Sequence, residues 1–190
     1  NLESKELPTE VFRLQLSTSV NNKLIYLNAF FARYNLEPLS LIDAQKQLST
    51  YNIESVPKEI LQHEVAPLVT ILVTTYNSEY YISTAIESLL RQTYSNIEIV
   101  VIDDASTDRT LDEIKRYSQK DPRVKCMALN ENVGTFVAKT QGLKESKGEF
   151  VTCHDSDDWA HPRKIEIQIA PLLKNASLVA TTSQWIRLQD

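Results

Sequence analysis

Two short segments rich in aspartate are the part of this chain best suited to chemistry. One is the pair Asp103-Asp104, and the other is the run Asp155-Ser156-Asp157-Asp158. Carboxylates that lie close together repel one another, so a cluster of them is costly unless a cation or several hydrogen-bond donors occupy it. Oxygen ligands without nearby thiolates favour a hard ion. We therefore expect Mg²⁺ or Mn²⁺, whose shell would be completed by water and by substrate phosphate.

A diphosphate substrate would find no glycine loop in this sequence. The chain has three glycines, Gly134, Gly142 and Gly148, and none belongs to a G-x-G-x-x-G or G-x-x-x-x-G-K-[ST] pattern. A metal ion would therefore have to provide most of the neutralisation of the phosphates.

Each aspartate segment also has an interpretation without catalytic function. The first pair could stabilise the N-terminal end of a helix over residues 106–117, where carboxylates are favourable. The run that begins at Asp155 resembles a calcium loop, but an EF-hand needs glycine and glutamate at its sixth and twelfth positions, where this chain has Ala160 and Glu166. Taken together, the two segments favour a binding site.

The elements that position these aspartates begin near residue 68. Apolar patterning predicts strands over residues 68–75, 97–102, 124–129, 149–153 and 178–182, separated by amphipathic helices that include Ile82, Leu111, Phe136 and Ile165. This alternation predicts an α/β fold with a mainly parallel sheet and helices on both faces. Such sheets bind ligands at the carboxyl ends of their strands, which is where both aspartate segments fall.

Apolar residues in residues 1–66 follow a different spacing, and we expect this part to form a helical extension followed by a linker. Two groups of apolar residues recur at helical spacing, namely Val20, Leu24, Leu27, Phe31 and Tyr34, and then Leu41, Ala44, Leu48 and Tyr51. The pattern predicts a helical hairpin. It carries no candidate chemistry, so packing or oligomer formation through these helices is the leading interpretation, and substrate recognition is the alternative.

Composition and charge narrow the class of protein. Hydrophobic residues make up 42% and charged residues 24%, as in an ordinary globular protein. A net charge of −5 argues against nucleic-acid binding. The sequence has no transmembrane run and no signal peptide, so we expect a cytoplasmic protein, with peripheral association at the inner face of the cell membrane left open. Cys126 and Cys153 lack C-x-x-C spacing, which predicts buried free thiols.

Four blocks of sequence, in this order, resemble the family 2 glycosyltransferases of the GT-A fold. They are residues 69–77 (VTILVTTYN), 88–94 (SLLRQTY), 99–108 (IVVIDDASTD) and 148–158 (GEFVTCHDSDD). The resemblance covers residues 67–190, which we expect to form a GT-A nucleotide-sugar-binding domain, and it excludes residues 1–66. The DSDD form resembles bacterial polysaccharide synthases of the hyaluronan and chondroitin type.

The resemblance implies a uracil pocket at the first two strand ends. Thr74 and Tyr76 would wall this pocket, with Tyr76 stacked on the base. Asp104 would accept a hydrogen bond from uracil N3, and Asp103 would support the same turn. The alternative for Tyr76 is an aromatic side chain that fills the core at the end of its strand.

The resemblance also implies where the rest of the nucleotide and the metal would bind. Lys139 matches a position near the nucleotide that is often basic in the family. Asp155 and Asp157 belong to the DxD motif and would contact the nucleotide. Asp157 and Asp158 would share the ribose hydroxyls and a Mn²⁺ or Mg²⁺ ion between them, with Asp157 the first choice as metal ligand and Asp158 the second.

The function that the resemblance implies is transfer of a sugar from a UDP-sugar to a hydroxyl of a glycan or other acceptor. Transfer would invert the anomeric carbon and serve bacterial polysaccharide or cell-surface glycan synthesis. In the family the general base lies on a later acidic motif, so we expect it beyond Asp190, together with the acceptor-binding part. Residues 1–190 alone are then expected to be inactive.

Three alternatives to a transferase remain. A nucleotide-sugar-binding domain without activity would share all these motifs. A sugar-nucleotide nucleotidyltransferase would need a glycine-rich, basic loop after the first strand, and residues 75–78 provide none. A phosphoacceptor receiver domain would have its acidic pair after the first strand, whereas here the pair follows the second.

Overall fold

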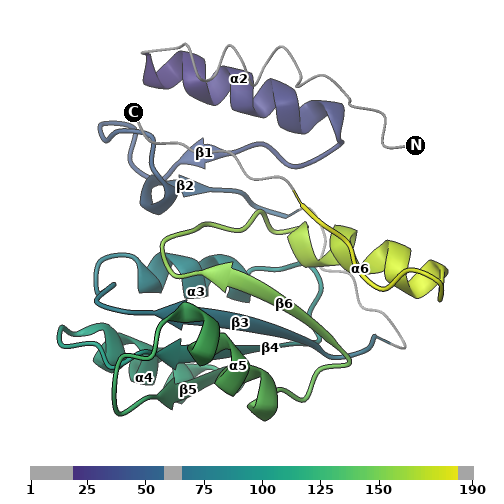
Figure 1. The fold of residues 1–190 in the computed structure, drawn as a ribbon. Coiled ribbons are helices and arrows are strands. Elements are labelled where there is room, and N and C mark those ends of the chain that lie inside the picture. Colours follow the sequence, from purple (N-terminus) through teal and green to yellow (C-terminus); the bar gives the residue numbers. More distant parts are fainter. Residues whose placement is uncertain (1–18, 58–65, 184–190) are drawn as a thin grey trace.

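The computed structural model describes residues 19–57 and 66–183, and its centre is a four-stranded sheet (Figure 1). The strand order is β5-β4-β3-β6. The strands are β3 (Val69–Thr75), β4 (Ile97–Asp103), β5 (Val124–Ala128) and β6 (Phe150–Asp155). All neighbouring strands are parallel, so their carboxyl ends share one edge of the sheet. The predicted α/β fold is confirmed.

Helices cover both faces of this sheet. The helices are α3 (Ile82–Leu90), α4 (Thr110–Lys120), α5 (Thr135–Glu145) and α6 (Lys164–Lys174). Side chains of α3, α4 and α6 share one hydrophobic cluster with alternate residues of β3 and β4, and α5 packs on the opposite face. Every residue of β3 and β4 is buried, as expected for β-branched strands covered on two sides.

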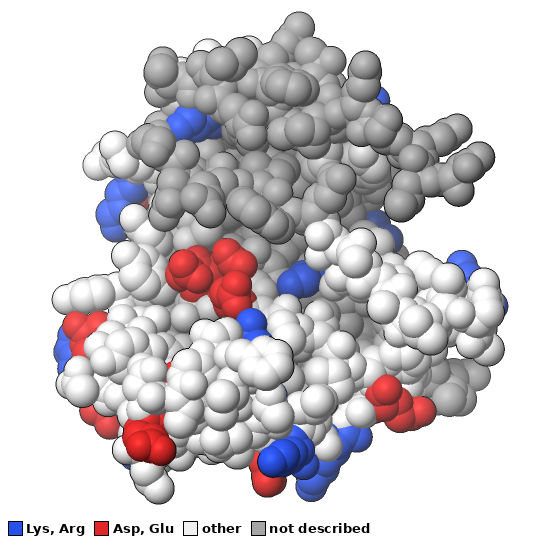
Figure 2. Space-filling view, viewed as in Figure 1, with Lys and Arg blue, Asp and Glu red and all other residues white. Residues whose placement is uncertain are grey.

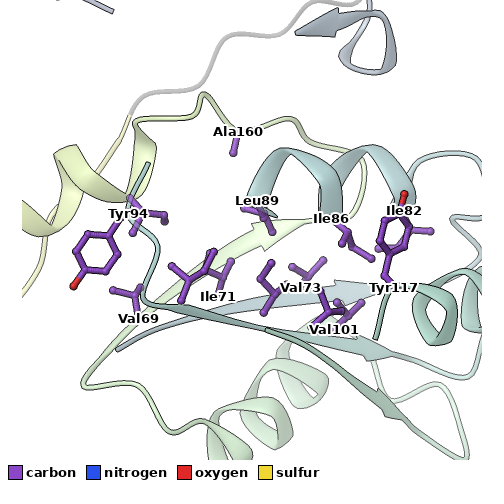
Figure 3. Close-up of a cluster of buried hydrophobic side chains, with 14 of the residues drawn as sticks. Val69, Ile71, Val73, Ile82, Ile86, Leu89, Tyr94, Val101, Tyr117 and Ala160 are labelled. Carbon is purple, nitrogen blue, oxygen red and sulfur yellow. The ribbon is translucent and has the colours of Figure 1, made fainter. Parts of the chain in front are cut away.

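The core between the sheet and α3 shows why these two elements pair. Ile82, Ile86 and Leu89 recur at three-and-four spacing along α3, which places them on one face of the helix. Ile71 and Val73 alternate along β3 and therefore point to one face of the sheet. Figure 3 shows these side chains directed toward one another across the space between the helix and the sheet.

A buried carboxylate ties the strands to the turn before β6. Glu98 of β4 is 4% exposed and lies on the α5 face of the sheet. Its oxygens accept hydrogen bonds from Thr70 Oγ1 at 2.5 Å, from the Lys147 amide at 2.6 Å and from Lys125 Nζ. Thr70 Oγ1 in turn accepts from the Gly148 amide at 2.9 Å. The network fixes the start of β6, which carries the aspartate run at its far end.

Residues 19–57 form a separate layer beside β6 and α6 in Figure 1, and the sequence prediction is only half right here. The first predicted helix is present as α2 (Val20–Arg33). The second is wrong, because this stretch forms the antiparallel strands β1 (Ser40–Leu41) and β2 (Ile53–Glu54), joined through the 3-10 helix η1 (Thr50–Asn52).

The buried side chain of Asn52 explains why the second helix does not form. It accepts a hydrogen bond from the Asp43 amide at 2.9 Å, and it donates to the carbonyls of Asp43 at 3.0 Å and Gln47 at 2.9 Å. Backbone groups that a helix would pair with one another are paired with a side chain instead. Leu48 still packs with Leu27 of α2, but from a non-helical segment.

Other expectations differ from the structure in smaller ways. Residues 178–182 do not form the predicted strand. Within the described residues β6 pairs only with β3, and Val179 is 95% exposed. Cys126 is half-buried and Cys153 exposed, so the prediction of two buried thiols is wrong. The parts of the expected extension and linker that fall on residues 1–18 and 58–65 lie outside the described residues. Among the described helices, none is long and apolar enough to cross a bilayer.

Candidate functional site

The carboxyl ends of β3, β4 and β6 bring the predicted site residues to one edge of the sheet. The strand register pairs Thr75 with Asp103 on one side and Thr74 with Asp155 on the other. Asp103 and Asp155 therefore flank the end of β3, one on each neighbouring strand. Residues more than 50 positions apart in the sequence share this edge because the crossovers are parallel.

Asp104 is buried and already holds two hydrogen-bond donors. Asp104 is only 4% exposed to solvent. Its two oxygens accept from the backbone amides of Val133 and Gly134, each at 2.8 Å. These amides directly precede α5, so Asp104 fixes the start of that helix against the sheet. Asp104 therefore has hydrogen-bond donors, which are one of the two kinds of partner expected for these carboxylates.

Asp103 leaves one buried oxygen unpaired. Its Oδ2 accepts from the Ser106 amide at 3.2 Å, whereas Oδ1 has no hydrogen-bond partner in the described structure. Thr75 Oγ1, on the neighbouring strand, is buried and unpaired in the same way. Buried polar atoms almost always have partners. Two orphaned atoms at adjacent strand ends therefore mark a position where a ligand could supply them.

The aspartate pair does not cap a helix over residues 106–117, so that interpretation is wrong. α4 begins at Thr110. The carboxylate at its start belongs to Asp108, whose Oδ1 accepts from the Thr110 amide at 3.0 Å. Asp103 and Asp104 are left for other roles.

The loop that follows β3 exposes an aromatic ring beside these carboxylates. Tyr76 is 49% exposed, so it does not fill the core and its ring is accessible. The loop is tied to the turn after β4, because the Asn77 amide donates to Ser106 Oγ at 2.9 Å and Asn77 Oδ1 accepts from the Thr107 amide at 2.8 Å. Asn77 and Ala105 have φ values of 49° and 60°. Left-handed backbone at a residue other than glycine is strained, and such strain often occurs at functional sites.

The aspartate run after β6 forms an exposed acidic turn. Asp155, Asp157 and Asp158 are exposed. Partial desolvation raises the pKa of the Asp158 carboxyl above its ordinary value, and the charges of Asp157 and Asp155 raise it further. Lys139 of α5 reaches this turn, with its Nζ 3.1 Å from Asp155 Oδ1. Figure 2 shows a group of acidic side chains where β6 ends in Figure 1, with basic side chains beside it.

Lys164 is a second cation at this turn, and the sequence interpretation missed it. Burial lowers the pKa of its ammonium, while the charges of Asp158 and Asp155 act in the opposite direction. Its Nζ lies 3.4 Å from Nδ1 of His154. His154 is 5% exposed, and burial followed by the charge of Lys164 lowers its pKa to about 4, so it is neutral at pH 7. The sequence held one signal for Lys164. It is the first residue of α6, and a cation is unfavourable at the N-terminal end of a helix, so a lysine there suggests nearby negative charges.

The block of residues 88–94 gains a physical role in the structure. Ser88 Oγ accepts from the Ala160 amide at 3.1 Å. The Gln92 side chain donates to the His161 carbonyl at 2.9 Å and accepts from the Ile165 amide at 3.0 Å. These side chains at the end of α3 hold the segment between the acidic turn and α6. They position the site without belonging to it.

The carboxylates of the acidic turn are the candidate metal ligands. Within residues 19–57 and 66–183, no three side chains of histidine, cysteine, aspartate or glutamate are arranged to hold a metal ion. Mg²⁺, however, commonly takes only one or two protein carboxylates and completes its shell with phosphate oxygens and water. The exposed carboxylates of Asp157 and Asp158 fit an ion of this kind.

Curated glycosyltransferases match somewhat more than half of this chain. An uncharacterized glycosyltransferase of Haemophilus influenzae is 39% identical over 109 residues, which are 57% of this chain and 44% of that protein. The Escherichia coli protein named UDP-Glc:alpha-D-GlcNAc-diphosphoundecaprenol beta-1,3-glucosyltransferase WfgD is 40% identical over 108 residues, which are 57% of this chain and 42% of that protein. The chain thus spans less than half the length of either relative.

A solved structure shares the fold at similar sequence identity. Residues 1–349 of TarS from S. aureus superimpose with a TM-score of 0.52 and 35% identity, over 56% of this chain and 32% of that one. Crystal structures of the same TarS segment are described in complex with UDP and with UDP-GlcNAc.

The family assignment rests on the larger part of the chain. The sequence model described as "Glycosyl transferase family 2" matches residues 70–188, which contain the sheet, the acidic turn and α6. The parallel sheet with helices on both faces is the GT-A arrangement of the TarS structure. This chain belongs to glycosyl transferase family 2 and has the GT-A fold.

Proposed function

We propose that this chain forms the donor site of a glycosyltransferase that transfers a sugar from a UDP-sugar to a hydroxyl of a glycan acceptor, with inversion and with a divalent metal ion. The observation that carries the proposal is the arrangement of three strand ends. An exposed ring and orphaned buried polar atoms lie at the ends of β3 and β4, and an exposed acidic turn flanked by two lysines lies at the end of β6.

The uracil would bind at the ends of β3 and β4. The half-exposed ring of Tyr76 offers a stacking surface at the end of β3, where Thr74 is buried. Asp103 Oδ1 and Thr75 Oγ1 lack partners in the described structure and are available to a ligand. Asp104 can still accept from uracil N3, because each carboxylate oxygen has two lone pairs and each uses one on a backbone amide. The names of the relatives support uridine, since TarS is described with UDP and WfgD is named for UDP-Glc.

The diphosphate would bind at the acidic turn. Asp157, with Asp158 beside it, would hold a Mn²⁺ or Mg²⁺ ion. When bound, such an ion supplies electrostatic stabilisation of the negative charge on the departing diphosphate. Lys139, which pairs with Asp155, and Lys164, which interacts with the charges of Asp158 and Asp155, would each add positive charge for the phosphates. No general base is assigned among the described residues.

Titration of UDP into the protein by calorimetry, with MnCl₂ and then with EDTA, tests the proposal. Manganese should tighten UDP binding at least about tenfold, or roughly 1.4 kcal/mol, because a cation held by Asp157 and Asp158 would offset the repulsion between these carboxylates and the diphosphate. Asp157→Asn should remove this gain. Glu145→Gln, which changes an exposed carboxylate at the far end of α5, should keep it. CDP should bind more weakly than UDP, since cytosine N3 has no proton for Asp104. UDP binding that EDTA leaves unchanged would refute the metal assignment, and equal affinity for CDP would refute the uracil pocket.

A further inference from the structure

The layer formed by residues 19–57 lies outside the family match, yet it contacts the segment that follows the acidic turn. Trp159 comes directly after Asp158, and its side chain packs against the hydrophobic cluster of this layer. The buried members of that cluster are Leu27, Leu39, Leu48 and Ile53. Figure 1 shows the layer beside the end of β6 and the start of α6. The residue next to the proposed metal ligands therefore packs against the core of the N-terminal layer.

His161 joins the same segment to the turn after α2. Its Nε2 lies 3.1 Å from the Glu37 carbonyl, and its Nδ1 accepts from the Arg163 amide at 3.2 Å. A carbonyl can only accept and an amide N–H can only donate, so the neutral ring with its proton on Nε2 satisfies both contacts. The ring of Phe31 in α2 packs edge-on against His161, with ring centroids 5.1 Å apart.

Arg163 adds a second polar contact to the end of α2. Its Nη1 donates to the Asn35 carbonyl at 3.0 Å, and its Nη2 pairs with Glu166 Oε1 at 2.9 Å. Asn35 has a φ of 52°, the left-handed conformation that turns the chain after α2. Two side chains from residues 159–163 thus bind two backbone carbonyls of one short turn.

These contacts act from the side opposite to α3. Ser88 and Gln92 hold residues 160–165 from the sheet side, and the N-terminal layer holds residues 159–163 from the other side. An exposed turn whose carboxylates must bind an ion loses conformational entropy on binding, and neighbours that fix it beforehand reduce this cost.

We propose that residues 19–57 are a positioning element of the donor site, which orders the acidic turn by holding residues 159–163 and so sets the affinity for UDP with its metal ion. His161 is the central positioning residue. The link to affinity rests on the proposed donor-site function. The ordering of the turn is a property of the unliganded protein and can be measured by itself.

The chain offers variants that separate this role from general packing. Phe31→Ala removes the ring contact to His161 from within α2. His161→Gln keeps a donor for the Glu37 carbonyl, whereas His161→Ala removes it. Glu54→Gln is the matched control, because the Glu54–Arg91 pair also joins the layer to the rest of the chain, at 3.9 Å, but lies at the end of α3 rather than at the acidic turn.

The first measurement is amide hydrogen exchange in the unliganded protein. Phe31→Ala and His161→Ala should speed exchange in peptides covering residues 155–162 by about tenfold or more, while β3 and β4 keep wild-type protection. His161→Gln should restore part of the protection, and Glu54→Gln should behave as wild type. Wild-type exchange of residues 155–162 in Phe31→Ala and His161→Ala would overturn the proposal.

The second measurement is calorimetric titration of UDP at saturating MnCl₂. Phe31→Ala and His161→Ala should weaken UDP about fivefold to twentyfold, His161→Gln less, and Glu54→Gln not at all. Faster exchange at the turn with unchanged UDP affinity would overturn the role in binding. If wild-type protein bound no UDP, the donor-site function and the link to affinity would both fail, while the exchange data would still decide whether the layer orders the turn.

Discussion

Glu98→Gln is the substitution whose effect follows most directly from the structure. Burial acts to raise the pKa of the Glu98 carboxyl, but hydrogen bonds from Lys125, Thr70 and the Lys147 amide outweigh it and lower the pKa from 4.5 to about 2. If the pKa of Glu98 is 4.5 in the unfolded chain and about 2 in the folded one, the ionised carboxylate contributes on the order of 3 kcal/mol to the free energy of unfolding. The Lys125 side chain is 39% exposed, so solvent screening makes this figure an upper limit.

The sign of the pH dependence follows from the lowered pKa. The stability contributed by Glu98 is fully present above about pH 4.5, and it is lost as the pH falls toward about 2, because the unfolded chain binds a proton that the folded chain does not. Glutamine has no such titration. The stability difference between wild type and Glu98→Gln should therefore be largest near pH 7 and shrink between pH 4.5 and pH 2.

Urea unfolding followed by circular dichroism at pH 7, 5, 4 and 3 measures this difference. The comparison between variants cancels the titration of other carboxylates, which also affects stability in acid. Glu145→Gln, which removes an exposed carboxylate in the last turn of α5, is the control and should unfold at about the same urea concentration as wild type at pH 7. A difference between wild type and Glu98→Gln that stays constant from pH 7 to pH 3 would refute the reasoning.

Two further predictions concern the turns that lead to the site. Gly148→Ala should destabilise the fold by about 2 kcal/mol or more, since the new Cβ would lie 2.5 Å from the Thr70 backbone nitrogen, while Gly142→Ala should cost less because its Cβ would meet the side-chain end of Ile102 at 2.7 Å. Equal losses in thermal unfolding would contradict this. Asp104→Asn should weaken UDP and also lower the free energy of unfolding by about 1–3 kcal/mol, because an amide NH₂ would face the donor of Val133 or Gly134. Unchanged unfolding would show that the carboxylate serves only the ligand.

The sequence by itself determined the order of elements and the edge of the sheet that carries the site. The β-branched runs at residues 69–75 and 97–103 predict buried parallel strands, because the side-chain period of a strand is a local property. The aspartates fall at strand ends, and parallel topology then places those ends together. Nothing in this inference needed a contact between distant residues.

The tertiary structure alone decided what each of these side chains contacts. Asp104 binds amides 29 and 30 residues away, and Lys164 reaches the acidic turn from the start of α6. The segment after Leu41 is not helical because Asn52 takes its backbone partners. His161 meets a carbonyl 124 residues away, which brings the N-terminal layer to the site. Such contacts depend on how packed elements cross in space, and local periodicity carries no information about that.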